Sequence, residues 1–102
     1  MLRMSREFGF SVSAFHHALQ AWRIPDQMRE AGVTIATFSD LTWYKMEAWD
    51  ASTNSPKVLY DAGVPVAIKS DHPVLFAGDL MYEASKAHYY GLPKYVLLFL
   101  TL

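Results

Sequence analysis

The sequence contains no cysteine, only five prolines and five glycines, and no excess of either charge. The absence of cysteine excludes disulfides and Cys-ligated metal sites. Nine Lys and Arg residues stand against ten Asp and Glu residues, which argues against a nucleic-acid partner because nucleic-acid-binding proteins usually carry a basic excess. No apolar run reaches the ~18 residues that a transmembrane helix needs, and no signal-peptide pattern is seen at the N-terminus. We therefore expect no membrane association and a cytoplasmic protein by default.

Hydrophobic residues, by contrast, are plentiful. They make up 52% of the 102 residues, whereas charged residues make up 19%. This composition excludes a disordered chain, and the length allows one domain at most. Aromatic residues reach 15%. We expect most of them to be buried in the core, and the alternative is that some line a ligand-binding cleft.

An internal repeat organises the chain. Residues 31–40 and residues 62–71 both begin with Ala-Gly-Val and end with Ser-Asp, and the two runs are offset by 31 residues. A period of about 30 residues suits one βα unit. The repeat therefore predicts two similar helix–strand segments.

The residues before each repeat support this interpretation. Pro25 and Pro56 suit the first turn of a helix, where a missing N–H has no helical partner. Gly32 and Gly63 follow the two expected helices, and glycine suits the left-handed conformation that closes a helix. The runs that come next, 33–38 and 65–69, are largely apolar and β-branched, as in strands covered on both faces.

A third strand is expected over residues 9–15, and a third helix from Phe76 or Asp79 to Tyr90. The stretch 40–51 is expected to be a longer loop with some helix. The order β-α-β-α-β-α predicts an α/β fold with a parallel sheet. Three such units leave two free sheet edges, whereas a closed eight-stranded barrel needs about 250 residues. We therefore expect residues 1–102 to form a single partial domain with an atypical apolar tail over 94–102.

Polar side chains follow each expected strand, where parallel α/β proteins assemble their sites. They are His16, His17, Ser39, Asp40, Ser70, Asp71 and His72. Imidazole and carboxylate groups are ligands of Zn²⁺, which lowers the pKa of its bound water to about 7. Asp71 is suited to take a proton from such a water. The structural alternative is that the histidines are surface residues and that Asp71 caps a turn.

Three runs of the sequence resemble a known family. They are Phe15–Trp22, Ala31–Asp40 and Gly63–Pro73, the last containing Ser-Asp-His-Pro. In this order they resemble the C-terminal part of the catalytic barrel of the amidohydrolase superfamily, above all its imidazolonepropionase-like and cyclic amidohydrolase members. The resemblance covers about residues 8 to 93. It implies a partial TIM (β/α)8 barrel comprising about strands six to eight.

The resemblance also implies roles for individual residues. The family's sixth strand ends in a histidine that binds metal or substrate, and it falls on the His16-His17 pair, with His17 slightly favoured. The aspartate that ends the eighth strand falls on Asp71, which would contact the metal and move the proton. His72 would lie beside the pocket.

The expected substrate pocket also draws on the loop after the seventh strand. By the same resemblance, Trp43, Tyr44 and Trp49 would shape that pocket. The substrate would be a small amide or cyclic amide, and the cofactor of the intact enzyme a divalent metal ion, with zinc favoured.

Two hypotheses follow. In the first, the chain is a truncated metal-dependent hydrolase of C–N bonds that is inactive alone and holds no metal, because the family's ligands from its first, fourth and fifth strands have no counterpart here. In the second, it is a non-enzymatic module that docks or self-associates through its free strand edges and apolar tail. A nucleotide-binding protein is disfavoured because the sequence has no Gly-rich phosphate loop.

Overall fold

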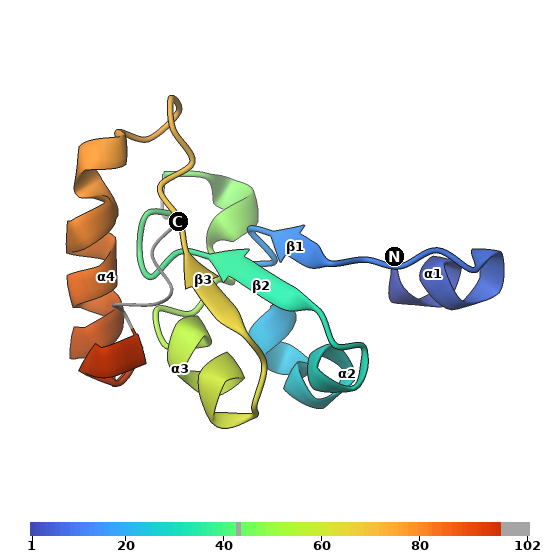
Figure 1. Ribbon diagram of the computed structural model, residues 1–102. Helices are drawn as coiled ribbons and strands as arrows, with labels where there is room; N and C mark the ends of the chain where they lie inside the picture. The colour runs from blue at the N-terminus through green and yellow to red at the C-terminus, as the bar shows by residue number, and fades with distance from the viewer. Residues whose placement is uncertain (43, 97–102) are drawn as a thin grey trace.

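The computed structural model describes residues 1–42 and 44–96. Its centre is a parallel sheet in the order β1-β2-β3, formed by β1 (Ala14–His16), β2 (Thr34–Thr37) and β3 (Val66–Ile68) (Figure 1). Phe15 is paired with Ile35, and Ile35 is paired in turn with Val66. The predicted α/β fold with a parallel sheet is therefore confirmed.

Helices alternate with these strands. They are α1 (Leu2–Phe8), α2 (Pro25–Glu30), α3 (Ser55–Asp61) and α4 (Leu80–Tyr89), with short 3₁₀ turns η1 (Ala21–Arg23), η2 (Met46–Ala48) and η3 (Ala77–Asp79). Pro25 and Pro56 lie in the first turns of α2 and α3. Gly32 and Gly63, which follow these helices, have φ angles of +65° and +81°. Local sequence signals thus place both helix–strand junctions.

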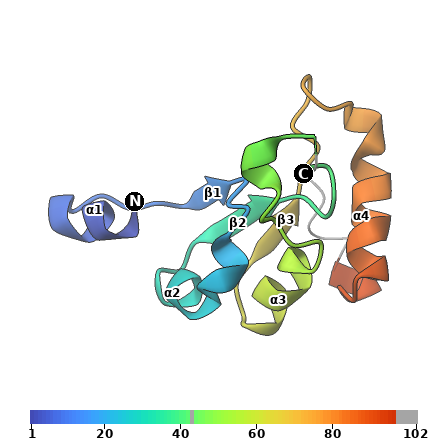
Figure 2. The same ribbon diagram turned by 180° about the vertical axis from the view of Figure 1, so that it is seen from behind.

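The N-terminal region differs from the expectation. Helix α1 was not predicted, and β1 starts at Ala14 and extends to His16 instead of covering residues 9–15. Helix α1 buries none of its residues, and it extends beyond β1, away from the sheet (Figures 1 and 2). Of the residues of α1, Leu2 packs against the core cluster, so the helix presents little of the apolar face that is the main sequence signal of a helix.

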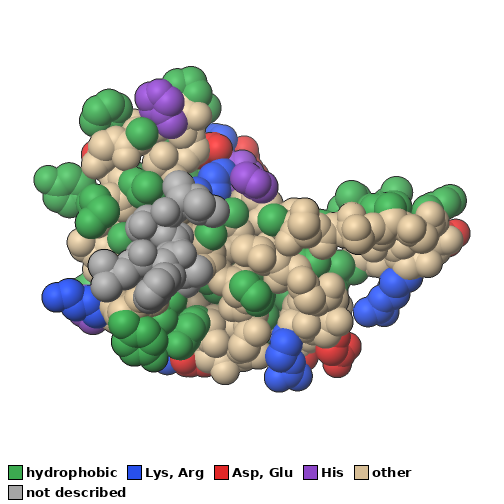
Figure 3. All heavy atoms as spheres, viewed as in Figure 1, with side chains coloured by type: hydrophobic (Ala, Val, Ile, Leu, Met, Phe, Trp, Pro, Cys, Tyr) green, Lys and Arg blue, Asp and Glu red, His purple; other side chains and the backbone are tan. Residues whose placement is uncertain are grey.

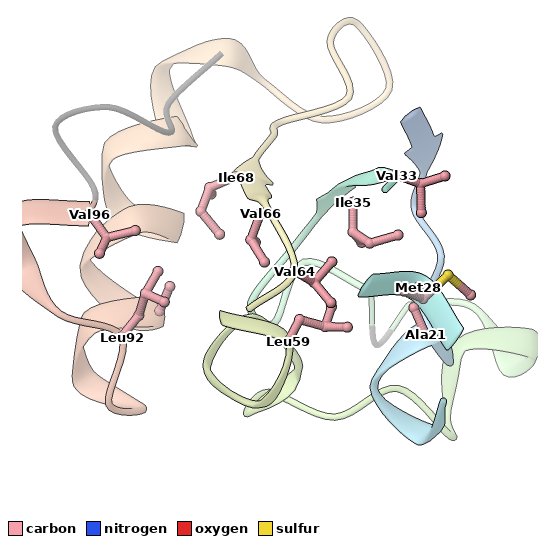
Figure 4. Packing of buried hydrophobic residues seen from close by; sticks show 11 residues of the cluster. Ala21, Met28, Val33, Ile35, Leu59, Val64, Val66, Ile68, Leu92 and Val96 are labelled. Atoms are coloured by element: carbon pink, nitrogen blue, oxygen red, sulfur yellow. The ribbon is translucent and has the colours of Figure 1, made fainter. Parts of the chain in front are cut away.

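The core lies around β2 and β3. All three residues of β3 are buried, as expected for a strand covered on both faces. Ile35, Leu59 and Ile68 are completely inaccessible to solvent and belong to one hydrophobic cluster (Figure 4). Helix α4 packs beside β3. This packing holds the ends of β2 and β3 in place, whereas both outer residues of β1 are exposed.

The apolar tail is described only in part. Val96 is buried and belongs to the core cluster. The rest of the predicted tail, residues 97–102, lies outside the described residues. Across residues 1–42 and 44–96, no helix is long and apolar enough to cross a membrane.

Candidate functional site

His17, Lys69 and Asp71 come together at the carboxyl edge of the sheet. His17 follows β1, whereas Lys69 and Asp71 follow β3. The Nζ atom of Lys69 lies 2.9 Å from Oδ1 of Asp71 and 3.5 Å from Nδ1 of His17. The Nε2 atom of His17 lies 3.9 Å from the same Asp71 oxygen. We call these three residues the edge cluster.

Unusual backbone conformations surround the edge cluster. The φ angles of His17, Ala18 and Asp71 are +65°, +40° and +64°. Positive φ is uncommon for residues other than glycine, and such conformations concentrate at functional sites. The N–H of His17 still donates to the carbonyl of Ala36 on β2. The chain therefore turns sharply only after it has left the sheet.

Lys69 is the residue of this cluster that sequence reasoning missed. It is only 9% exposed, and its Nζ lies 4.9 Å from the centroid of the Phe38 ring. A lysine is rarely buried without a partner. A lysine at the end of an otherwise apolar strand, two residues before an aspartate, was therefore the signal that could have identified it.

The electrostatics of the cluster follow from this buried ammonium group. The hydrogen bond from Lys69 lowers the pKa of Asp71 below its ordinary value. Partial burial, together with the nearby positive charge of Lys69, lowers the pKa of His17. At neutral pH the cluster therefore presents a carboxylate and a neutral imidazole, which are both proton acceptors.

His16, the other half of the histidine pair, lies elsewhere. Its side chain lines a groove of about 720 Å³ together with Phe15, Leu19 and Met28. Successive side chains of a strand point to opposite faces. The structure brings His17, and not His16, to Asp71.

The residues expected to line a substrate pocket follow β2 and β3 in the chain. The Nδ1 atom of His72 accepts a hydrogen bond from the N–H of Ala77 at 3.3 Å, within the loop that follows β3. Tyr44 and Trp49 are 56% and 71% exposed. Trp43 lies outside the described residues. The roles of these residues in substrate binding remain predictions.

A second polar cluster joins α4 to the residues that follow β2, and we call it the Glu83 cluster. Glu83 of α4 is completely buried, and its Oε2 atom accepts hydrogen bonds from the N–H groups of Ser39 and Asp40 at 2.7 and 3.3 Å. Lys86 lies 2.6 Å from Oδ1 of Asp40 and 3.7 Å from Oε1 of Glu83. Asp40 and Ser39 therefore tie α4 to the end of β2.

The donor groups at the edge do not fit a divalent metal ion. A catalytic zinc site usually has three protein ligands. In the part of the chain that the structure describes, no group of three His, Cys, Asp or Glu side chains could hold an ion. The edge cluster offers two such ligands, and the Lys69 ammonium already contacts the Asp71 oxygen. The space-filling view shows a histidine, basic and acidic side chains close together on one face of the molecule (Figure 3).

Comparisons with known proteins test the family resemblance. No family model matches the chain. The chain is 38% identical to "Amidohydrolase tasK" of Hapsidospora irregularis over 96% of its own length, but it spans only 10% of that protein. It also superposes on the crystal structure of an amidohydrolase from Thermotoga maritima MSB8 with a TM-score of 0.85 and 28% identity. That match covers 95% of this chain and 25% of the other. The two matches confirm the resemblance and show that the chain spans a small part of each relative.

Proposed function

We propose that this chain, which is homologous to a segment of amidohydrolases, forms part of a hydrolase barrel. This part carries the proton-moving aspartate, Asp71. The complete enzyme would hydrolyse C–N bonds of small amides or cyclic amides. The observation that carries the proposal is the meeting of His17 and Asp71 at the carboxyl edge of a parallel sheet. In parallel α/β folds this edge is where sites are assembled.

The roles of the edge residues follow from their charge states. Lys69 keeps Asp71 ionised through a hydrogen bond to Oδ1. An ionised carboxylate beside a reacting water can accept its proton and then protonate the leaving nitrogen. His17 is neutral near pH 7 because its pKa is lowered, so it can bind or orient the substrate through a ring nitrogen.

We further propose that the chain alone is catalytically incomplete. Two ligand side chains meet at the edge, fewer than the three of a usual catalytic zinc site. In the complete barrel, a divalent metal ion, with zinc favoured by the resemblance, would be held largely by groups from other strands. This proposal leaves Asp71 and His17 as contributors to a site that needs further residues.

Catalytic incompleteness is tested on the purified chain. We expect no hydrolysis of a panel of amides and cyclic amides above the uncatalysed rate, with or without added Zn²⁺. Asp71→Asn is the matched variant, because it removes the charge and keeps the shape. Turnover by the wild-type chain that Asp71→Asn abolishes would show that the chain is a complete enzyme.

The role of Asp71 is tested in a longer relative. In an amidohydrolase that carries an aspartate at the position of Asp71, its substitution by asparagine should lower kcat by about 10²-fold or more, since general acid–base groups contribute on this scale. Circular dichroism should show an unchanged fold. Unchanged turnover in that variant would remove the catalytic assignment of Asp71.

A second candidate function is docking or self-association through β1. The N–H of His17 and the carbonyl of Ser13 bond to β2, so by alternation the N–H groups of Ala14 and His16 point toward the free edge. The groove of about 720 Å³ lies beside this edge. Light scattering on wild type and on Ala14→Pro separates the candidates, because proline removes an N–H only from the free edge. A wild-type monomer contradicts self-association, whereas an oligomer that Ala14→Pro dissociates supports it.

A further inference from the structure

Lys69, which follows the outer strand β3, joins the ends of all three strands at the carboxyl edge. Its ammonium group contacts one residue from beyond the end of each strand: His17 after β1, Phe38 after β2 and Asp71 after β3. The rings of His17 and Phe38 also lie 5.4 Å apart. The side chain of Lys69 is 11% exposed, compared with 46% for His17 and 29% for Asp71. The most buried member of the cluster is thus the one that carries a positive charge.

We propose that the Lys69 ammonium is the resident cation of this edge and that it prevents divalent metal ions from binding between His17 and Asp71. The inference concerns which cation occupies the space between His17 and Asp71. It rests on the proposed function, which assigns these two residues to the hydrolase site. It adds a determinant of cation choice that the family resemblance does not assign.

Two observations support the proposal, and a third supplies its control. First, Lys69 donates to Oδ1 of Asp71, which is also the Asp71 oxygen that faces Nε2 of His17. A metal ion shared by these two atoms would bind each at about 2.0–2.2 Å. It would therefore compete with Lys69 for the same oxygen, and the two positive charges would repel each other at close range.

Second, Lys69 is held in place by its surroundings. Its backbone N–H donates to the carbonyl of Thr37 at 3.0 Å, which continues the pairing of β2 and β3 beyond the strand end. Its ammonium group lies 4.9 Å from the Phe38 ring centroid, within the range of a cation–π interaction. The ammonium group is therefore fixed at the edge, unlike the mobile head of a surface lysine.

Third, the molecule contains a suitable control lysine. Lys86 also pairs with an aspartate, since it lies 2.6 Å from Oδ1 of Asp40. Its side chain is 42% exposed, and it does not contact His17 in the described structure. A Lys86→Met substitution removes a comparable ion pair and leaves the edge cluster intact.

The experiment measures Co²⁺ binding to the full chain by calorimetry and by visible absorption. Lys69→Met should bind one equivalent of Co²⁺ at least about tenfold more tightly than wild type, about 1.4 kcal/mol in binding free energy. Lys86→Met should bind like wild type. Adding His17→Ala to Lys69→Met should abolish the gain, because the imidazole would then be missing. Circular dichroism and urea unfolding establish which variants fold, and Lys69→Gln replaces Lys69→Met if the latter does not.

Two results would overturn the inference. One is stoichiometric Co²⁺ binding by wild type that is as tight as binding by the Lys69 variant. The other is a folded Lys69 variant that binds Co²⁺ no better than wild type, which would make Lys69 a purely structural ion-pair partner. Both results are independent of amide hydrolysis, so the inference and the proposed function can fail separately.

Discussion

The edge cluster and the Glu83 cluster both pair a lysine with carboxylates, but they bury opposite charges. At the edge, Lys69 is 11% exposed and Asp71 is 29% exposed. In the Glu83 cluster, the Glu83 side chain is 1% exposed and Lys86 is 42% exposed. The pKa shifts follow this difference: the bond to Lys69 lowers the pKa of Asp71, whereas burial raises the pKa of Glu83. A buried ammonium group therefore keeps a carboxylate ionised at the surface, whereas a buried carboxylate serves to join two parts of the fold.

The two clusters also differ in what their carboxylates contact. Glu83 accepts hydrogen bonds from the backbone N–H groups of Ser39 and Asp40, so its loss would leave buried donors without a partner. Among the described residues, the carboxylate of Asp71 contacts the side chains of Lys69 and His17. We therefore infer that the Glu83 cluster stabilises the fold and that the edge cluster is available for chemistry or binding.

The largest effect on stability is expected for Glu83→Ala. It removes the acceptor of two N–H groups and leaves a cavity, and we expect the free energy of unfolding to fall by about 2–4 kcal/mol. Asp71→Asn, which tolerates the positive φ of this position and keeps an acceptor for Lys69, should lower it by only about 0–1 kcal/mol, as is usual for a partly exposed ion pair. Urea unfolding at pH 7 measures both. Equal losses would contradict the division into a structural cluster and an available one.

The pH dependence of stability sharpens the comparison. The pKa of Glu83 is raised above its ordinary value of 4.5, so the folded state holds this proton more tightly than the unfolded state. The part of the stability that comes from protonation of Glu83 is present below pH 4.5 and is lost as the pH rises through the raised pKa, whereas the hydrogen bonds from Ser39 and Asp40 remain. Glu83→Gln does not titrate, and its unfolding free energy should lack this decline. Parallel pH profiles for wild type and Glu83→Gln would argue against a raised pKa.

The smallest effect on the pH dependence of stability is expected for Asp71→Asn. The pH dependence that Asp71 contributes has the opposite sign to that of Glu83. The pKa of Asp71 is lowered below its ordinary value of 3.8, so its contribution is present above that pH and is lost as the pH falls through the lowered pKa. Its size should be below about 1 kcal/mol. Unfolding curves of wild type and Asp71→Asn between neutral and acid pH measure it. Greater stability of Asp71→Asn than of wild type at pH 7 would contradict a favourable Lys69–Asp71 pair.

Some features of this protein could be predicted from short stretches of sequence. Pro25 and Gly32, and Pro56 and Gly63, act through local backbone preferences, so they marked the helix ends without knowledge of the rest of the chain. The apolar runs after each glycine marked β2 and β3 because fully buried strands are apolar on both faces. Helix α1 also ends at a glycine in the left-handed conformation, Gly9 at φ +70°, but it has no proline in its first turn and buries no residue, and it was missed.

The candidate site was only partly predictable for the opposite reason. Asp71 could be identified from its place after an apolar strand, but the sequence left His16 and His17 as alternatives, and the turn at φ +65° selects His17 as the neighbour of Asp71. Whether His17 binds a metal stays a prediction. The role of Lys69 depends on His17, which is 52 residues away in sequence.

The sequence by itself determined the order of helices and strands from β1 onward, the parallel sheet and the edge at which polar residues gather, because backbone preferences and burial patterns act over a few residues. Tertiary structure decided which charges are buried and which side chains meet. Glu83 reaches Ser39 across 44 residues, and Lys69 reaches His17 across 52. Such contacts depend on the packing of whole elements and on the exclusion of water between them, which no local pattern encodes.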